Sequence, residues 1–512
     1  MGSLDDGFLT MLTSQKVMET FEKLKSSKTD MIPSDDGDVI NLYPGSDDIT
    51  HEMFLANIND HISIICEKGV TGKYRFAPFK EHKIPKPPFV SVDDAIKAGT
   101  EKGKEDKFIR VLSMSTIQDT IFQKIMADVL GEYADEKFST HIDLHSFGYR
   151  KEKSSKMAVK KIRRLIDNGY CHVLDGDIQG FFDEINHTLL AERMSLFFGE
   201  ENVLLHKFLY RFLHVDRIRP KKMGLYRKGA YIAEKRTKGI PQGGVLSGLL
   251  ANVFLFNFDM YVVNNLMPRY GFKYFRYADD FVLMFKDKTQ INEVYELIRY
   301  RLQQNDKLHL HEIGNKTKLL DLSPPKNERL DFLGFEISPN GLRIKNDNVR
   351  KFRSRIAQTL SEIEVDTQDG KLSWDEAFFR VAVRRINNKI VGLEDLIEQC
   401  KENKGLCTKC CKLIPKRSWI GYFMMVTDVE QLREIDKMIR AAICRAYKKE
   451  TGKNLRKKIM LHYTKDTPEP LKLVTKKYYE YRKQVERHGD KICRCERFFD
   501  KETGTIKVIE ST

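Results

Sequence analysis

Two adjacent acids stand in the middle of a stretch that otherwise has the pattern of a strand hairpin. The tetrad 277–280 (YADD) lies between the runs 274–276 and 281–285, which consist mostly of aromatic and aliphatic residues. A carboxylate in a buried sheet carries a large desolvation penalty unless a cation meets it. Magnesium is the obvious cation, because it is a hard ion that prefers carboxylate oxygens. The tetrad therefore predicts a metal site, with an exposed turn as the alternative.

A second acidic stretch lies upstream, in residues 170–178. Its β-branched and apolar residues predict a strand, and a helical pattern follows from Asp183 to Phe197. Because side chains alternate along a strand, Asp175 and Asp177 share one face. If this strand lies beside the hairpin, the acids converge on two metal ions. Such a pair, roughly 3.5–4 Å apart, would clamp the attacking and leaving oxygens of a phosphoryl displacement. For Asp177 alone, a strand-end acid or a helix cap is the alternative.

The segment 239–247 (GIPQGGVLS) lies between the two acidic stretches. Proline and paired glycines end the preceding element and let the backbone approach a ligand closely. The run 245–263 that follows is strongly apolar but is interrupted by four polar residues: Ser247, Asn252, Asn257 and Asp259. We therefore expect a buried core helix there and not a membrane span.

Together these motifs resemble those of reverse transcriptases. The segments 177–183 (DIQGFFD), 239–247 and 277–280 occur in the order used by that family, and they look most like its bacterial branch of group II intron, retron and defence-associated enzymes. Three further segments are similar to the family's fingers motif, to the Lys-Thr of the fourth palm motif and to the primer-grip hairpin: 145–154 (HSFGYRKEKS), 315–317 (NKT) and 332–335 (FLGF). The resemblance covers roughly residues 80 to 345.

The resemblance implies catalytic and metal-binding roles for three acids: Asp177, Asp279 and Asp280. They would hold two Mg²⁺ ions, which Mn²⁺ could replace, while Asp175 lies outside the family's triad and would support them. Phe182 stands where the family places its steric gate, whose ring would clash with a 2′-hydroxyl and so select deoxynucleotides. Because Phe181 is adjacent and one of the two must pack inward, a core aromatic is the alternative role for Phe182.

Four more residues would contact the nucleotide according to the resemblance: Gln242, Arg110, Lys86 and Lys316. Gln242 would lie against the incoming nucleotide. Arg110 would hold its triphosphate, because arginine binds phosphate bidentately, and Lys86 is a weaker candidate for the same task. Lys316 would protonate the leaving pyrophosphate, with a solvated surface lysine as the alternative.

The charge balance favours a polyanionic partner. The 512 residues include 88 Lys and Arg against 73 Asp and Glu, which gives a net charge of +15 and a pI near 9.1. Such an excess promotes nucleic-acid binding through counterion release. Residues 156–166 alternate basic and apolar side chains, which predicts a helix whose basic face is either solvated or a rail for the template. We expect nucleic-acid contacts from three residues: Arg150, Lys160 and Lys161.

The expected fold is α+β, a right-hand polymerase with fingers, a palm built on an antiparallel sheet and a helical thumb. The expected domains are an N-terminal extension (1–75), fingers (76–169), a palm (170–335, with 200–238 returning to the fingers), a helical thumb (336–460) and a basic C-terminal segment (461–512). Hydrophobic periodicity predicts helices over 9–24, 116–133, 346–363, 374–389, 393–403 and 428–449.

The predicted reaction is attack of a primer 3′-oxygen on the α-phosphate of a deoxynucleotide, copied from RNA into DNA, with pyrophosphate released. The expected partners are an RNA template, foremost a noncoding RNA, the DNA product and deoxynucleotides, without a membrane and with self-association left open. The long C-terminal region, which lacks a paired-histidine endonuclease motif, favours a stand-alone antiphage defence enzyme. The alternatives are a group II intron maturase, a template-independent DNA polymerase and an RNA-binding scaffold without catalysis.

The chain opens without a charged-then-apolar leader, so we expect it in the cytoplasm, in a bacterium. Its nine cysteines are then expected to be mostly free thiols. Five of them have spacings that resemble a zinc site only loosely: Cys407, Cys410, Cys411, Cys493 and Cys495.

Overall fold

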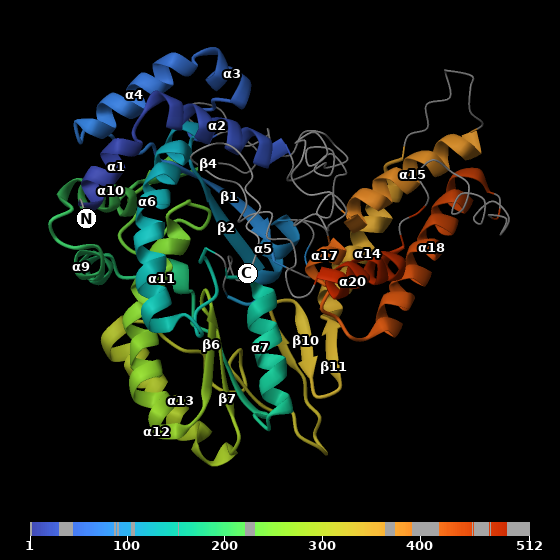
Figure 1. Cartoon of the computed structure of the whole chain (residues 1–512). Coiled ribbons are helices and arrows are strands. Elements are labelled where there is room, and N and C mark those ends of the chain that lie inside the picture. Colours follow the sequence, from blue (N-terminus) through green and yellow to red (C-terminus); the bar gives the residue numbers. More distant parts are fainter. Residues whose placement is uncertain are drawn as a thin grey trace. The chain divides into compact units, whose positions relative to one another are not determined.

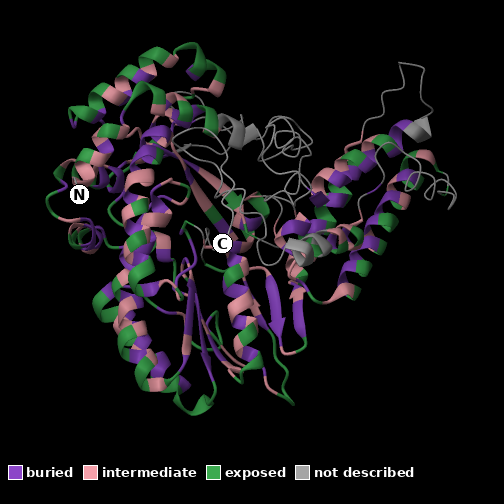
Figure 2. Ribbon diagram, viewed as in Figure 1, coloured by how far each residue is buried: buried purple, intermediate pink, exposed green. Residues whose placement is uncertain are grey.

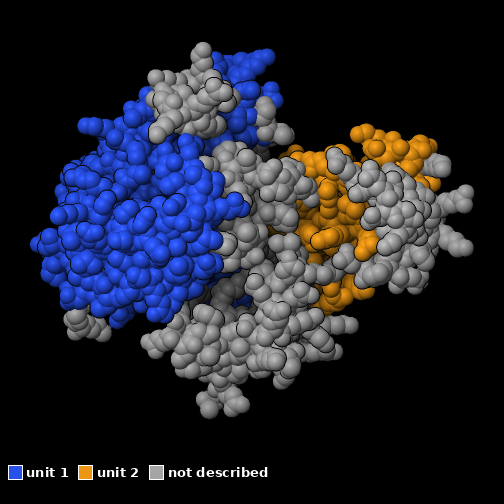
Figure 3. Space-filling model, turned by 90° about the horizontal axis from the view of Figure 1, so that it is seen from above, with its two compact units in different colours: residues 1–328 blue, residues 329–512 orange. Residues whose placement is uncertain are grey.

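The computed structural model describes most of the chain in two compact units, residues 1–328 and 329–512 (Figure 3). The described residues are 3–29, 45–86, 89, 92–103, 108–151, 153–220, 231–363, 374–391, 419–452, 454, 471 and 473–488. The predicted α+β class is confirmed, because helices and antiparallel sheets occur in both units. None of the described helices is both long and apolar enough to cross a lipid bilayer.

A four-stranded antiparallel sheet carries the acidic motifs (Figure 1). Its order is β6-β7-β3-β8, with β3 at His172–Gly176, β6 at Lys273–Tyr277, β7 at Asp280–Phe285 and β8 at Lys318–Asp321. Residues 281–285 of β7 are all buried, in keeping with their apolar sequence (Figure 2). The helix α7 (Ser155–Asp167) packs against β6. Strand β7 is thus buried except at Asp280, whereas β8 stays exposed or half-buried along its length.

A second sheet of unit 1 has the order β2-β1-β4-β5. It consists of β1 (Phe79–Pro85), β2 (Ile109–Met114), β4 (Arg217–Pro220) and β5 (Tyr231–Glu234). Strand β4 pairs with β1 in parallel, whereas the other pairs are antiparallel. The chain therefore returns to this sheet after β3.

Long helices fill the core of unit 1. The apolar run predicted as a buried helix forms α11 (Ser247–Tyr261), in which Asn252 and Asp259 are fully buried. Helix α6 (Ile117–Ile142) extends beyond its predicted end at residue 133, because Ala134, Phe138 and Ile142 continue its buried face. The other helices of unit 1 are α3 (His51–Ala56), α4 (Ile58–Val70), α5 (Val92–Thr100), α10 (Val203–Leu213), η2 (Val262–Leu266), α12 (Met267–Tyr270), η3 (Lys288–Gln290), α13 (Ile291–Arg301) and η4 (Leu302–Asp306).

Two predicted helices are interrupted. The pattern from Asp183 onward splits into α8 (Phe181–Glu184) and α9 (His187–Phe198), because the Asn186 side chain accepts a hydrogen bond from the Leu189 amide and caps a new helix. The pattern over 9–24 splits in the same way into α1 (Leu4–Met11) and α2 (Ser14–Thr29), where the Thr13 hydroxyl accepts from the Lys16 amide. Local capping overrides hydrophobic periodicity at both points.

The first helix is part of the core of unit 1. Both carboxylate oxygens of Asp5 accept hydrogen bonds from the first amides of α10, those of Leu204 and Leu205. Phe8 is completely buried, with its ring edge-on to the rings of Phe122 and Phe208. The N-terminal helix α1 therefore packs against α6 and α10 and stabilises them.

Unit 2 combines a small sheet with helices. The antiparallel sheet has the order β11-β10-β9, with β9 at Leu330–Phe332, β10 at Phe335–Ser338 and β11 at Gly341–Ile344. The segment 332–335 therefore forms a hairpin turn. The helices are α14 (Asn346–Ser361), α15 (Trp374–Val391), α17 (Trp419–Tyr422), α18 (Val429–Thr451) and α20 (Val474–His488).

Three of the predicted helices of the C-terminal half correspond to α14, α15 and α18. The predicted helix 393–403 and the five cysteines of the loose zinc pattern lie outside the described residues. Three cysteines inside them are free thiols: Cys66, Cys171 and Cys444. In the basic segment, Tyr478 is buried and its hydroxyl donates a hydrogen bond to the Val426 carbonyl, so this tyrosine has a packing role.

Candidate active site

The acidic tetrad forms the tip of a two-residue hairpin. Tyr277 pairs with Asp280, which leaves Ala278 and Asp279 as the turn between β6 and β7. Ala278 has a φ of +59°, the left-handed conformation that such tight turns require. Strand β7 also pairs with β3, and Gly176 lies opposite Phe281. Asp177 directly follows Gly176, so the sheet register brings it beside the tip of the hairpin.

The acids interact electrostatically at this tip. Burial, followed by the charges of Asp279, Asp177 and Asp175, raises the pKa of Asp280 to about 7. Burial and the charge of Asp177 likewise raise the pKa of Asp279. Asp280 keeps some exposure to solvent, and the three neighbouring carboxylates add to the effect of burial on its pKa. The structure therefore concentrates negative charge where the sequence predicts a metal site.

The Lys-Thr pair of residues 316 and 317 lies next to Asp177. The Lys316 ammonium is 3.4 Å from the Asp177 carboxylate, although 60% of its side chain is exposed. Thr317 is fully buried, and its hydroxyl accepts a long hydrogen bond of 3.5 Å from the Asp177 amide. Lys316 is thus close to the acids but free to turn toward a ligand.

The donor set fits a hard divalent cation. All the crowded donors are carboxylate oxygens, and a cation between them would relieve the repulsion that raises their pKa values. Within the described part of the chain, no three His, Cys, Asp or Glu side chains form a ready-made ligand shell. If Mg²⁺ binds, the oxygens of Asp177, Asp279 and Asp280 would have to draw closer around it.

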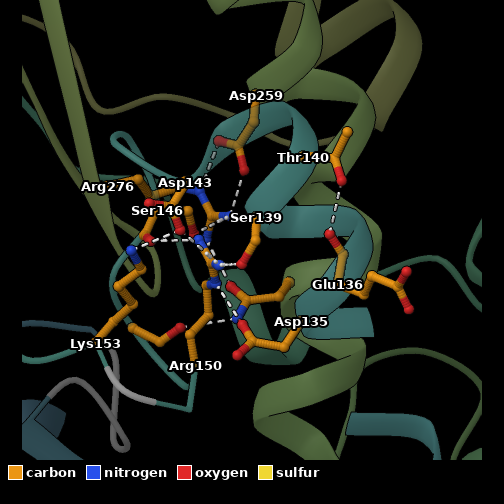
Figure 4. A network of polar contacts seen from close by, with 12 residues as sticks. Asp135, Glu136, Ser139, Thr140, Asp143, Ser146, Arg150, Lys153, Asp259 and Arg276 are labelled. Carbon is orange, nitrogen blue, oxygen red and sulfur yellow. Dashed lines mark hydrogen bonds and ion pairs between the residues drawn. The ribbon is translucent and has the colours of Figure 1, made fainter. Parts of the chain in front are cut away.

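The buried side chain of Arg276 links the hairpin to helix α11 (Figure 4). Arg276 of β6 is completely buried, and its guanidinium forms a two-pronged ion pair with Asp259 of α11, at 2.8 and 2.5 Å. Its remaining N–H groups donate to Asn252 Oδ1, to Ser146 Oγ and to the Ala278 carbonyl at 2.8 Å. All five guanidinium donors are therefore satisfied. Burial alone would lower the pKa of Arg276, but Asp259 outweighs it and raises the pKa.

The backbone of the predicted fingers motif, residues 145–154, packs against Arg276 and Asn252. Ser146 and Arg276 form a parallel β-bridge, and the Asn252 amide donates to the Gly148 carbonyl. A Cβ added at Gly148 would lie 2.4 Å from the Ala278 nitrogen. Only glycine permits this approach of the motif to the catalytic turn.

Arg150 of that motif is buried in the structure, which corrects the expectation that it contacts nucleic acid. Only 1% of its side chain is exposed. Its guanidinium donates to the Asp135 and Asp143 carboxylates, the Ser139 hydroxyl and the Ser146 carbonyl (Figure 4). These intramolecular acceptors leave it no surface for a phosphate, so Arg150 ties the motif to α6.

Phe182 and Gln242 lie on opposing segments. Phe181 is buried, whereas Phe182 is half-buried, so Phe181 is the member of the pair that packs inward. The Ile240 amide donates to the Phe182 carbonyl, and the Gln242 side chain donates to Asp183 at 3.2 Å. The glycine-rich segment therefore packs directly on the segment that carries the expected gate.

Two of the expected cationic residues are exposed, and a third is half-buried. Arg110 on β2 and Lys86, just after β1, are exposed. The strand of Arg110 is tied to Gln242, because the Ser113 amide donates to the Gln242 carbonyl at 2.7 Å. Lys160 of α7 is half-buried.

Lys161, also on α7, has its ammonium 5.2 Å from the centre of the Phe147 ring, and burial lowers its pKa. It therefore packs partly against the protein.

Sequence reasoning missed two features of this site, the Arg276 network and the placement of Tyr149. A signal for the first existed, because Asn252 and Asp259 interrupt an apolar helix and buried polar side chains need partners. Nothing in the local pattern identified Arg276 as the partner.

The comparison with known proteins agrees with this geometry. The family described as reverse transcriptase (RNA-dependent DNA polymerase) matches residues 101–337, a stretch that includes all three acids. The chain contains a reverse transcriptase domain. It is 28% identical over 366 residues to protein YkfC of Escherichia coli, covering 63% of this chain and 85% of that protein.

The chain is also similar to the group II intron-encoded protein LtrA of Lactococcus lactis, with 23% identity over 405 residues. This match covers 65% of the chain and 63% of LtrA, which is less than two thirds of that relative. Among solved structures, apo telomerase from Candida tropicalis is a distant likeness, with a TM-score of 0.40, 13% identity and coverage of 76% of this chain and 67% of that one. Residues 101–337 belong to the reverse transcriptase family, whose activity class is RNA-directed DNA polymerase, and the chain is similar to bacterial group II intron-like proteins.

The raised pKa of Asp280 predicts a pH-dependent stability. Between its ordinary pKa of 3.8 and about 7, the folded protein keeps a proton that the unfolded chain has lost. The metal-free protein should therefore lose stability as the pH rises through this window. Asp280→Asn should remove this part of the slope and raise the melting temperature at pH 7.5 in EDTA by a few degrees.

The matched control for this experiment is Asp287→Asn, at the other end of β7. Hydrogen bonds from Thr289 lower the pKa of Asp287, so its removal should not flatten the slope. Thermal melting curves between pH 4 and 8 measure both variants. Equal slopes in the parent and in Asp280→Asn would contradict the proposed charge crowding.

The Arg276 network predicts that an arginine-to-methionine substitution costs far more stability at position 276 than at position 269. Arg276→Met leaves the Asp259 charge buried without its cation, which should cost about 3–5 kcal/mol. Arg269→Met removes an exposed ion pair with Glu293 and an exposed contact with the Tyr270 ring, which together should cost about 1 kcal/mol. Hydrogen exchange of residues 273–285 measures the local opening free energy in both variants, and similar losses would contradict the role assigned to Arg276.

Proposed function

We propose that the chain synthesises DNA on an RNA template with Asp177, Asp279 and Asp280 as its catalytic, metal-binding acids. The observation that carries this proposal is the convergence of these acids at one hairpin tip with a raised pKa of Asp280. Divalent cations, Mg²⁺ or Mn²⁺, would neutralise the charge that develops on the reacting phosphate. Unit 1 would supply the fingers and the palm, and unit 2 the thumb.

The residues around the acids would each contact a different part of the nucleotide. Arg110 would bind the triphosphate, Gln242 would lie against the nucleotide and Phe182 would exclude a 2′-hydroxyl. Lys316 lies near Asp177 and is exposed, so its ammonium can reach the leaving pyrophosphate and protonate it. Lys86, Lys160 and Lys161 would assist through contacts with phosphates.

The proposed setting is antiphage defence, with a noncoding RNA as template or partner. It rests on the long region beyond residue 337, which lies outside the family match. The proposed location is the cytoplasm, where nucleic acids and deoxynucleotides are available. Self-association stays open in this proposal.

A second candidate is a group II intron maturase. The similarity to a protein named as group II intron-encoded favours it. Such an enzyme would bind one structured intron RNA and assist its splicing. Template-independent synthesis is a further variant, because the acids perform nucleotidyl transfer whether or not a template is present.

The catalytic assignment predicts the behaviour of Asp279→Asn. The variant should lose primer extension on an RNA template by about a hundredfold or more, because the acid is needed to hold the metal at the reacting phosphate. Its melting temperature and RNA affinity should stay at or above those of the parent, since a crowded charge has been removed. Asp287→Asn is the control and should keep full activity. Primer extension by Asp279→Asn at the parental rate would refute the metal role.

The biological setting predicts which nucleic acids co-purify with the protein. Deep sequencing of bound RNA and DNA should find one noncoding RNA and complementary DNA if the defence proposal is right. An enriched intron RNA would support the maturase instead. DNA without any complementary RNA would indicate untemplated synthesis and contradict the RNA-copying proposal.

A further inference from the structure

Tyr149 occupies an unusual position beside the acids. It lies in the turn between α6 and α7 with a φ of +54°, which bulky residues rarely adopt. Despite its size, 56% of the residue is exposed. A chain that needed only this turn would carry glycine or asparagine here, because both adopt the left-handed conformation at lower cost. A strained and exposed aromatic side chain therefore points to a task at the site.

The neighbours of the Tyr149 ring define that task. The ring lies 6.2 Å from the Phe182 ring and nearly perpendicular to it, at 81°. On its other side, a Cβ added to Gly248 would lie 2.5 Å from two ring carbons. The Tyr149 ring is thus held between the first turn of α11 and Phe182.

Tyr149 also lies within electrostatic reach of the acids. Burial raises the pKa of its hydroxyl, the charges of Asp279 and Asp280 raise it further and Arg110 lowers it. The contact with the expected gate, Phe182, is made by the ring and not by the hydroxyl. Arg150, the next residue, turns into the protein, so the two neighbours have opposite roles.

We propose that Tyr149 is a positioning residue for sugar selection, whose ring holds the Phe182 ring in place beneath the incoming nucleotide. This inference rests on the proposed gate role of Phe182. The edge-to-face contact with Tyr149 restrains the half-buried Phe182 ring, which also meets the Phe181 ring edge-on at 5.4 Å. Without Tyr149, Phe182 can rotate away and admit a 2′-hydroxyl.

The test is a double-mutant cycle in the full-length chain. Tyr149→Asn removes the ring but tolerates the left-handed turn, and Tyr149→Phe keeps the ring without the hydroxyl. Each is combined with Phe182→Ala. The readout is kcat/KM for dATP and for ATP on an oligouridine template annealed to a DNA primer, together with the melting temperature.

Phe182→Ala should reduce the preference for dATP by about a hundredfold. Tyr149→Asn should reduce it by about tenfold, mainly through faster use of ATP and with kcat for dATP largely kept. Tyr149→Phe should match the parent. In the Phe182→Ala background, Tyr149→Asn should have no further effect on selectivity, because its action passes through Phe182.

Three outcomes would overturn the inference. Unchanged selectivity in Tyr149→Asn, with Phe182→Ala still relaxed, rejects the role of Tyr149 and leaves the gate intact. Equal effects of Tyr149→Asn and Tyr149→Phe assign the effect to the hydroxyl and not to the ring. Unchanged selectivity in Phe182→Ala rejects the gate itself. If Tyr149→Asn melts at a lower temperature than the parent, Tyr149→Gly repeats the test with the same turn geometry.

Discussion

The buried ion pair between Arg276 and Asp259 is the interaction on which the catalytic hairpin depends. A fully buried guanidinium is costly unless every donor has an acceptor, and here all five do. One of those acceptors is the Ala278 carbonyl, in the turn that carries Asp279. Helix α11 therefore fixes the position of the hairpin that carries Asp279 and Asp280 through a side chain on strand β6. Such pairs add little net stability compared with apolar packing, but they specify one geometry.

The two charged clusters of this region differ in whether their charges are neutralised by a partner. Behind the hairpin, the charge of Arg276 is matched by Asp259 in a dry environment. At its tip, the carboxylates repel one another, and the exposed Lys316 lies 3.4 Å from Asp177. The first cluster is rigid because it is complete. The second is incomplete without a cation, which is the arrangement expected where a metal and a phosphate bind.

Glycines set the distances between segments that are remote in sequence. Gly148 lets the fingers motif approach Ala278, and Gly248 leaves room for the Tyr149 ring. Gly239, with a φ of +77°, lets the segment 239–247 pack on the backbone of Phe182. A methyl group at any of these positions would push apart elements that have to meet around one nucleotide.

The sequence by itself determined the fold class, the strands beside the acids and the buried nature of α11. The fold class follows from the resemblance of the motifs to those of reverse transcriptases, and the strands and α11 follow from local periodicity. It could not determine the neighbours of the fingers motif, where Arg150 turns inward to Asp135 and Tyr149 turns outward to Phe182. That choice depends on a left-handed turn and on partners from distant segments. Only the packed tertiary structure brings such partners within hydrogen-bonding and van der Waals distance.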